Sequence, residues 1–259
     1  MKTLKVIKIG GNIINNEVDL LSFLKGFSNL IGPKILVHGG GKLASNLSNK
    51  MNIPVQLIDG RRVTNAETLD IITMVYAGKI NKNIVAKLQS FGCNSVGFSG
   101  ADGNTIIANK RPETPINYGF AGDIVKVNID VLKILINNDI TNIFSAISHD
   151  KKGQLLNTNA DTVASELAIA FSNDYKVELY YCFEKKGVLK RMNDENSVIK
   201  KINNKKYIEL KKSNIINEGM IPKLDNCFYA LDHNVSKVCI GQPTMLFDHH
   251  SNFTTIQKL

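Results

Sequence analysis

The chain has 259 residues, of which 43% are hydrophobic and 21% are charged, and its formal net charge is +9. A chain of this length can bury a large core as one domain or two joined lobes, and its regularly recurring apolar segments exclude a disordered protein. The N-terminus runs directly into a predicted strand, and no apolar run approaches the roughly 20 residues that a helix needs to span a bilayer, so we expect a cytoplasmic protein without membrane contact.

The first ninety residues alternate between predicted strands and helices, which is typical of βα units on a mainly parallel sheet. We predict strands at residues 4–9 and 35–37, each followed by a helix; the apolar face of the first helix extends to Ile31 and that of the second to Met51. A capping box from Thr64 to Glu67 then predicts one long helix. Its apolar residues are Leu69, Ile72, Tyr76, Ile80, Ile84 and Leu88.

The rest of the chain continues this alternation. One helix is predicted to begin near Asn159, and another follows Gly219 and is broken early by Pro222. No linker rich in proline, glycine or serine separates two domains, so we place a change of role within one continuous sheet, between residues 1–172 and residues 173–259. The predicted strands lie at residues 95–98, 105–108, 124–129, 142–147, 177–183 and 237–240.

The basic residues are concentrated in one segment. Residues 185–212 hold nine lysines and one arginine against three acidic residues. Such a segment is either a solvated face or a surface that attracts polyanionic small molecules such as ATP. Because no basic motif interleaved with aromatic residues accompanies it, we expect no binding to nucleic acid.

The cysteines and histidines predict no metal site. Cys93, Cys182, Cys227 and Cys239 lie far apart and form no C-x-x-C pair, so we expect buried free thiols. The adjacent pair His249-His250 is interpreted as part of a solvated tail.

Two predicted strand-to-helix turns are rich in glycine, at Gly10-Gly11 and at Gly39-Gly40-Gly41. Glycine allows the backbone to approach a ligand and to point N–H groups at an anion. One such turn alone would be interpreted as a tight connection, but two at the carboxyl ends of parallel strands indicate a ligand site at that edge. Neither turn matches a P-loop or the dinucleotide motif G-x-G-x-x-G, so the sequence predicts phosphate or carboxylate chemistry of another kind.

Two lysines accompany glycine turns. Lys8 interrupts an apolar strand just before Gly10, where its ammonium group is costly unless an anion meets it. Lys223 follows the turn at Gly219. Taken singly, either could be a surface lysine. Taken together, they suit the transfer of a phosphoryl group, for which catalysis consists mostly of positioning and of neutralising charge.

Seven motifs occur in order along nearly the whole chain and together resemble the amino acid kinase family. They are Lys8-Ile-Gly-Gly11, His38-Gly-Gly-Gly41, Gly60-Arg-Arg-Val-Thr64, Ala77-Gly-Lys-Ile-Asn-Lys82, Gly119-Phe-Ala-Gly-Asp-Ile124, Gly153-Gln-Leu-Leu-Asn-Thr-Asn-Ala-Asp161 and Gly219-Met-Ile-Pro-Lys-Leu224.

The resemblance implies a three-layer α/β/α sandwich with a largely parallel, open central sheet, as in carbamate kinase-like folds. It implies that residues 1–172 bind an acylated amino acid and residues 173–259 bind the nucleotide. The implied reaction is the ATP-dependent phosphorylation of the γ-carboxylate of N-acetyl-L-glutamate to an acyl phosphate, the second step of arginine biosynthesis, with Mg²⁺ carried on the nucleotide phosphates.

The resemblance also implies roles for individual residues. Lys8 and Lys223 would stabilise the transition state, and Asp161 would hold both lysines. The N–H groups of four glycines, Gly10, Gly11, Gly40 and Gly41, would hold the phosphoryl oxygens and the reacting carboxylate. Arg62 would pair with the substrate α-carboxylate, Asn157 would bind near the acyl amide, and the nucleotide would meet Glu184, Lys185, Gly187 and Asn217.

A homodimer without inhibition by arginine is also expected, because the first strand begins too early for the extra N-terminal helix of arginine-inhibited members. We place the dimer face on the long helix after Thr64, where Tyr76 and Ile80 would be partly exposed on a monomer.

Two departures from the family pattern keep alternatives open. Phe183-Glu184 stands where relatives carry Ser/Thr-Asp, which leaves the adenosine contacts open, although Lys185 and Lys186 could compensate. Arg61 stands where relatives carry an apolar residue. It either points to solvent or meets a second carboxylate, as in N-succinyl-L-glutamate, and it shares a pocket with Arg62 only if that segment is a loop.

Other functions of the same fold are alternatives as well. A glutamate, aspartate or carbamate kinase is one, although a free amine would call for an acidic group where Asn157 stands. A non-catalytic sensor of amino acids or nucleotides is another, but binding alone would not need the second lysine.

Overall fold

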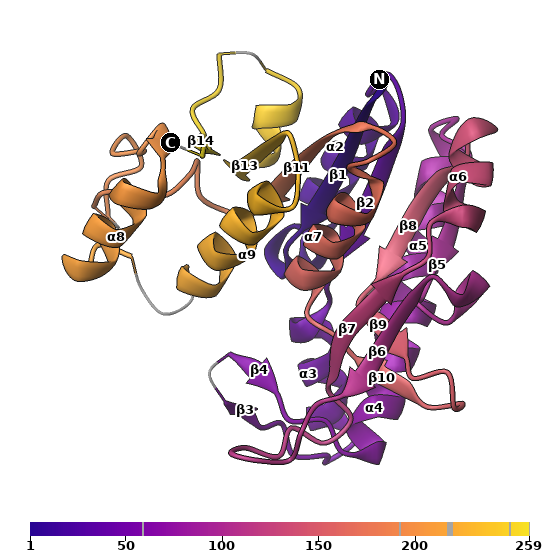
Figure 1. Ribbon diagram of the computed structural model, residues 1–259. Coiled ribbons are helices and arrows are strands. Elements are labelled where there is room, and N and C mark those ends of the chain that lie inside the picture. Colours follow the sequence, from indigo (N-terminus) through magenta and orange to yellow (C-terminus); the bar gives the residue numbers. More distant parts are fainter. Residues whose placement is uncertain (59, 192, 217–219, 249, 259) are drawn as a thin grey trace.

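The computed structural model describes residues 1–58, 60–191, 193–216, 220–248 and 250–258 (Figure 1). Its centre is an eight-stranded sheet with the order β12-β14-β13-β11-β1-β2-β8-β5. The strands are β1 (Thr3–Ile9), β2 (Lys34–His38), β5 (Ser95–Phe98), β8 (Thr141–Ser145), β11 (Lys176–Cys182), β12 (Lys201–Ile202), β13 (Lys237–Gly241) and β14 (Thr254–Ile256).

Six neighbouring strands of this sheet, from β13 to β5, run parallel to one another. The remaining two strands run in the opposite direction: β14 is antiparallel to β13, and β12 is parallel to β14. The largely parallel sheet predicted from the sequence is therefore confirmed. Its consequence for function is that the carboxyl ends of β1, β2, β8 and β11 all lie at one edge.

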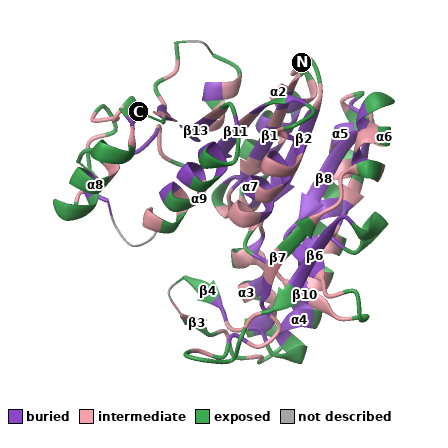
Figure 2. Ribbon diagram, in the orientation of Figure 1, coloured by how far each residue is buried: buried purple, intermediate pink, exposed green. Residues whose placement is uncertain are grey.

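Helices cover both faces of the central sheet and complete the three-layer sandwich (Figures 1 and 2). On one face, a core cluster joins the strands to α6 (Asp130–Asn137), α7 (Ala160–Phe171), α8 (Asn204–Lys212) and α9 (Ile221–Asp232). On the other face, a second cluster joins them to α1 (Gly11–Asn15), α2 (Glu17–Ser28), α3 (Gly41–Lys50) and the segment that contains α4 (Ala66–Ile72) and α5 (Asn81–Ser90).

The alternation of side chains along β1 decides which layer each residue faces. Leu4 and Val6 belong to the core on the α7 and α9 side, whereas Ile7 and Ile9 belong to the opposite core. Since successive side chains of a strand point to opposite faces, Lys8 lies on the side of α7 and α9. This orientation places the ammonium group of Lys8 near the beginnings of α7 and α9.

A smaller four-stranded sheet has the order β10-β9-β6-β7. Its strands are β6 (Ile106–Lys110), β7 (Gly122–Val127), β9 (Ile147–His149) and β10 (Leu155–Asn157). A two-stranded hairpin of β3 (Leu57–Ile58) and β4 (Arg61–Arg62) lies near α3 at the lower end of the molecule in Figure 1. Two short 3-10 turns, η2 (Asp102–Asn104) and η3 (Pro243–Leu246), connect other elements.

Several boundaries differ from the sequence prediction. The strand predicted at residues 142–147 is divided between β8 of the large sheet and β9 of the small one. Helix α2 ends at Ser28 and α3 at Lys50, so Ile31 and Met51 lie beyond them and are 91% and 51% exposed. Pro222 lies in the first turn of α9 and does not break that helix, since an N-terminal position needs no N–H donor.

The long helix predicted after Thr64 is confirmed in its extent, from Ala66 to Ser90, but its cap and its internal geometry differ from the prediction. Asn65, not Thr64, caps α4 and accepts a hydrogen bond from the Thr68 N–H at 2.8 Å. Between α4 and α5 the segment η1 (Thr73–Ile80) is a π-helix, which periodicity did not predict. Tyr76 and Ile80 are only 6% and 4% exposed, so the prediction that these two residues are partly exposed on a monomer is wrong.

The structure shows all four cysteines as free and buried, as expected. Within the described ranges, no helix combines the length and apolar character required to cross a membrane. The sequence analysis did not predict α6, α8, β10, β12, β14 or the β3–β4 hairpin. Most of these elements are short, and their apolar pattern is too brief to separate a strand or helix from a loop.

Candidate active site

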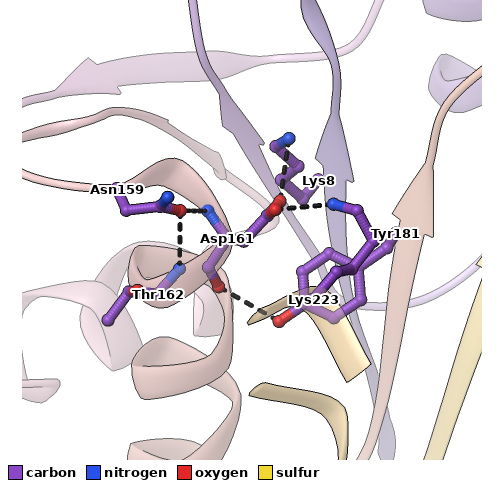
Figure 3. Close-up of polar contacts among 6 residues, drawn as sticks. All are labelled: Lys8, Asn159, Asp161, Thr162, Tyr181 and Lys223. Atoms are coloured by element: carbon purple, nitrogen blue, oxygen red, sulfur yellow. Dashed lines mark hydrogen bonds and ion pairs between the residues drawn. The ribbon is translucent and has the colours of Figure 1, made fainter. Parts of the chain in front are cut away.

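Three charged side chains, widely separated in the sequence, meet at the carboxyl edge of the central sheet (Figure 3). The Lys8 Nζ lies 2.8 Å from Oδ1 of Asp161, and the Lys223 Nζ lies 2.5 Å from Oδ2 of the same carboxylate. The three side chains are 13–17% exposed. The structure therefore brings together the three residues that the family resemblance assigned to catalysis.

Local structure fixes the carboxylate in this position. Asn159 caps α7, and its Oδ1 accepts hydrogen bonds from the N–H groups of Asp161 and Thr162 at 2.7 and 3.4 Å. Asp161 thus lies in the first turn of α7, where the helix dipole favours a negative charge. Lys223 lies in the first turn of α9, and Lys8 belongs to β1.

The electrostatics of this cluster favour the charged forms. Burial by itself would raise the pKa of Asp161, but Lys8 and Lys223 outweigh it and hold that pKa below its ordinary value. Burial lowers the pKa of Lys8, with Asp161 opposing the shift and Lys223 adding to it. Two ammonium groups face one carboxylate, so one positive charge has no counter-charge within the cluster. A partly buried excess cation of this kind favours an anionic ligand.

Two pockets meet at this cluster. The first has a volume of about 490 Å³ and is lined by Gly39, Gly40, Gly41, Arg62, Asn157 and Asp161 among others. The second has a volume of about 400 Å³ and is lined by Gly10, Phe183, Glu184, Lys185, Gly187 and Lys223 among others. Lys8 lines both pockets. Its ammonium group therefore lies where ligands bound in the two pockets would approach one another.

The turn after β2 shows why glycine is required there. A Cβ on Gly40 would lie 2.4 Å from Cδ1 of Ile80 and 2.8 Å from Cδ1 of Tyr76. The π-helical segment therefore packs directly against the turn, and any larger residue would displace it. In the described part of the chain, the N–H groups of Gly11, Gly40 and Gly41 have no protein acceptor, which leaves them available to an anion. Gly10 differs, because its N–H donates to the Cys182 carbonyl at 3.2 Å.

A buried histidine supports the same turn. His38 is fully buried; its Nδ1 donates to the Gly39 carbonyl at 2.9 Å, and its Nε2 accepts from Nδ2 of Asn81 at 3.0 Å. Burial lowers the pKa of His38 to about 4, so the ring stays neutral near pH 7. In the sequence His38 stands out only as part of a glycine motif, whereas the structure shows that it anchors the turn to α5.

Arg62 lines the first pocket and is held there by hydrogen bonds. It is 8% exposed, and its Nη2 donates to the Gly41 carbonyl at 3.0 Å and to the Ser45 hydroxyl at 2.7 Å. Its Nη1 is buried and has no partner in the described part of the chain. A buried guanidinium nitrogen without an acceptor is costly, so this atom is suited to bind a carboxylate of a ligand.

Other residues of the first pocket surround Arg62. The Asn157 amide donates to the Thr64 hydroxyl at 3.0 Å, and that hydroxyl donates to the Arg62 carbonyl. Arg61 lines the same pocket although β4 is a strand, so the requirement for a loop stated above was wrong. Arg111 also lines it; its Nε lies 3.1 Å from both carboxylate oxygens of Asp123. No sequence motif indicated Arg111.

The second pocket combines charged and apolar walls. Phe183, Glu184 and Lys185 line it together with Val188, Leu189, Ile215 and Ile216. The segment that departs from the family pattern therefore lies at the second pocket. Asn217, assigned to nucleotide binding from the sequence, lies outside the described residues.

Comparison with known proteins identifies the family. The chain matches the model of the amino acid kinase family over residues 3–242. It is similar to a protein named acetylglutamate kinase from Cytophaga hutchinsonii, with 53% identity over 249 residues that cover 96% of this chain and 94% of the relative.

Solved structures agree with the fold. The chain resembles smu.665 from Streptococcus mutans with a TM-score of 0.82 and 27% identity, over 98% of each chain. It resembles carbamate kinase from Giardia lamblia bound to AMP-PNP with a TM-score of 0.74 and 14% identity, over 100% of this chain and 99% of that one. The second likeness concerns the fold alone, and with it the predicted fold class is confirmed.

Proposed function

Because the chain belongs to the amino acid kinase family, we propose that it transfers the γ-phosphoryl group of ATP to the γ-carboxylate of N-acetyl-L-glutamate, as in the second step of arginine biosynthesis. The similarity to a relative named acetylglutamate kinase, which extends over 96% of this chain, supports this substrate. The observation that carries the proposal is the pair of lysines on one carboxylate at the junction of two pockets.

We propose that the acylated glutamate occupies the first pocket and ATP the second. All lining residues of the first pocket precede residue 172, whereas the second combines Lys8 and Gly10 with residues 183–223. This distribution supports an acyl-amino-acid lobe at residues 1–172 and a nucleotide lobe at residues 173–259. Arg62 pairs with the α-carboxylate through its free Nη1, and Asn157 meets the acyl amide.

In the proposed reaction, an oxygen of the γ-carboxylate attacks the γ-phosphorus of ATP. The bond from that phosphorus to the β,γ-bridging oxygen breaks, and ADP leaves with the electron pair. No general base is needed because the carboxylate is already deprotonated. Lys8 and Lys223 neutralise charge on the phosphoryl and bridging oxygens, and the N–H groups of Gly11, Gly40 and Gly41 bind oxygens of the two reacting groups.

We also propose that Mg²⁺ reaches the site on the nucleotide phosphates. Among the described residues, no group of three or more histidine, cysteine or acidic side chains could hold a metal ion. A magnesium ion that keeps several waters and binds mainly phosphate oxygens needs no such group. The ion would draw charge from the γ-phosphoryl group when it is bound.

The substrate proposal is tested by trapping the product. Acyl phosphates react with hydroxylamine to give hydroxamates, which can be measured together with ADP. N-acetyl-L-glutamate, N-succinyl-L-glutamate, glutamate, aspartate and carbamate are compared at equal concentration. Hydroxamate formation and ADP release with an N-acylglutamate are expected. Turnover with free glutamate, aspartate or carbamate, and none with the acylated compounds, would contradict the proposal.

A second acyl group is favoured by one specific observation. The pocket that contains Arg62 is also lined by Arg61 and Arg111, although N-acetyl-L-glutamate has a single carboxylate besides the reacting one. Arg111 already pairs with Asp123, whereas Arg61 lies on the exposed side of β4. N-succinyl-L-glutamate, whose acyl chain ends in a further carboxylate, is therefore the second candidate substrate.

We predict that Lys8→Ala and Lys223→Ala each lower kcat by at least 100-fold with less than a threefold change in KM, since their charges matter most in the transition state. Arg62→Ala should instead raise KM for the acylated glutamate at least tenfold, because it removes a ground-state ion pair. Steady-state kinetics with both substrates varied would distinguish these effects. Retention of half the wild-type kcat in either lysine variant would exclude the assigned role.

The metal proposal has a direct test. Excess chelator should abolish ADP release, and added Mg²⁺ should restore it. Gly78→Ala, on the exposed surface of η1, leaves both pockets unchanged and serves as the control variant. It should show the same loss and recovery of ADP release as wild type. Full turnover in the presence of chelator would show that the phosphates need no metal ion.

The acyl proposal predicts a change of preference in one variant. If Arg61 binds a succinyl carboxylate, wild type should prefer N-succinyl-L-glutamate and Arg61→Leu should lose that preference, measured as the ratio of kcat/KM values. Lys50→Leu, an exposed change at the end of α3, is the matched control. A wild-type preference of tenfold or more for the acetyl compound, about 1.4 kcal/mol, would exclude the succinyl substrate.

We finally propose a homodimer that acts in the cytoplasm and is not inhibited by arginine. The four buried free cysteines fit a reducing compartment. Light scattering should give twice the mass of the chain, and millimolar arginine should leave the rate unchanged. A hexamer, or clear inhibition by arginine, would contradict this.

A further inference from the structure

Tyr181 lies directly beneath the lysine-aspartate cluster and was not part of any motif. It belongs to β11 and is the in-register partner of Lys8 on the parallel strand β1. Partners in adjacent strands project to the same face of a sheet, so Tyr181 points, like Lys8, toward α7 and α9. Only 1% of Tyr181 is exposed, and it belongs to the core cluster on that side.

The side chain of Tyr181 contacts both helices that contribute to the cluster. Its hydroxyl donates a hydrogen bond to the backbone carbonyl of Asp161 at 3.0 Å. Its ring lies below the ammonium group of Lys223, with the Nζ 5.2 Å from the ring centroid (Figure 3). At this distance the negative face of an aromatic ring attracts a cation. One tyrosine thus meets α7 through its oxygen and α9 through its ring.

We propose that Tyr181 is a positioning residue for phosphoryl transfer, acting by holding the ammonium group of Lys223 over its ring. The proposal rests on the function proposed above. A lysine side chain has four flexible bonds, and Asp161 restrains only its tip. When the ammonium group turns from Asp161 toward a phosphoryl oxygen, the ring beneath it keeps an attractive contact throughout. The rotamers that would carry Lys223 away from the second pocket are thereby disfavoured.

The competing explanation is that Tyr181 only fills the core, with a satisfied hydroxyl. Tyr180, the next residue, provides a matched comparison because it is 6% exposed and points to the opposite face. Its hydroxyl donates to Glu178 at 2.6 Å, and Lys237 lies 5.8 Å from its ring centroid. It has the same kinds of contact and similar burial, but it does not touch the cluster.

The first test compares variants of the two tyrosines at a temperature where each is folded. Tyr181→Leu should lower kcat about tenfold with KM values for both substrates within twofold of wild type. Tyr181→Phe, which keeps the ring, should retain at least half of kcat, and Tyr180→Leu should change kcat less than twofold even if its Tm falls. A Tyr181→Leu kcat within twofold of wild type, or an equal loss in Tyr181→Phe, would overturn the proposal.

A second test does not depend on the leucine variant folding. Replacement of Tyr181 by phenylalanine with one, two or three ring fluorines keeps the shape nearly constant while weakening the negative face of the ring. If Tyr181 positions Lys223, kcat should fall stepwise with each fluorine, whereas a tyrosine that only fills space should give no trend.

The third readout separates this proposal from the function on which it rests. In protein labelled with ¹³C at lysine Cε, the Lys223 signal should be shifted upfield by the ring current of Tyr181. That shift should persist in Tyr180→Leu and vanish in Tyr181→Leu. If wild type forms no acyl phosphate but shows the shift, the proposed function fails while the contact stands. If wild type is active and the shift is absent, the positioning role is refuted.

Discussion

The site depends on one carboxylate that binds two ammonium groups, one at each of its oxygens. Asp161 lies at the start of α7, and it pairs with Lys8 of β1 and with Lys223 of α9. Removal of one member of a buried ion pair typically costs about 3–5 kcal/mol, because the remaining charge is left without a partner. Loss of Asp161 would leave two cations facing each other. The carboxylate therefore sets the distance between the lysines, and with it the place where two anionic ligands can meet.

The fold supplies what this interaction needs. Parallel strands bring the ends of β1, β2 and β11 to the same edge, and α1 and α3 begin there directly after β1 and β2. Gly40, in the turn before α3, packs against Ile80 of the π-helical segment. His38 holds the same turn through its hydrogen bonds to the Gly39 carbonyl and to Asn81. One lysine at the boundary of two pockets then serves both ligands. Precise placement of these groups suits a reaction in which positioning and charge supply most of the catalysis.

The sequence predicted the elements whose signals are local. The strand around Val37 has an uninterrupted apolar run, and that around Lys8 is apolar apart from its lysines. Two glycine turns are visible as motifs, and Asn159 is a recognisable helix cap. Contacts set by tertiary packing could not be predicted. Arg111, the residue after β6, lines the first pocket, and Tyr181 reaches the cluster only through the register of β11 with β1. The burial of Tyr76 against the glycine turn likewise depends on packing, and so the predicted exposure of Tyr76 was wrong.

The central claim is that Asp161 acts through the two lysines. The most direct measurement is a cycle of kcat values for Asp161→Asn, Lys8→Ala and Lys223→Ala, alone and combined. The effects should be strongly non-additive. Once both lysines are removed, Asp161→Asn should reduce the remaining rate less than threefold, because the carboxylate has nothing left to position. If Asp161→Asn lowers kcat by the same factor with and without the lysines, the carboxylate has an independent role and the account is wrong.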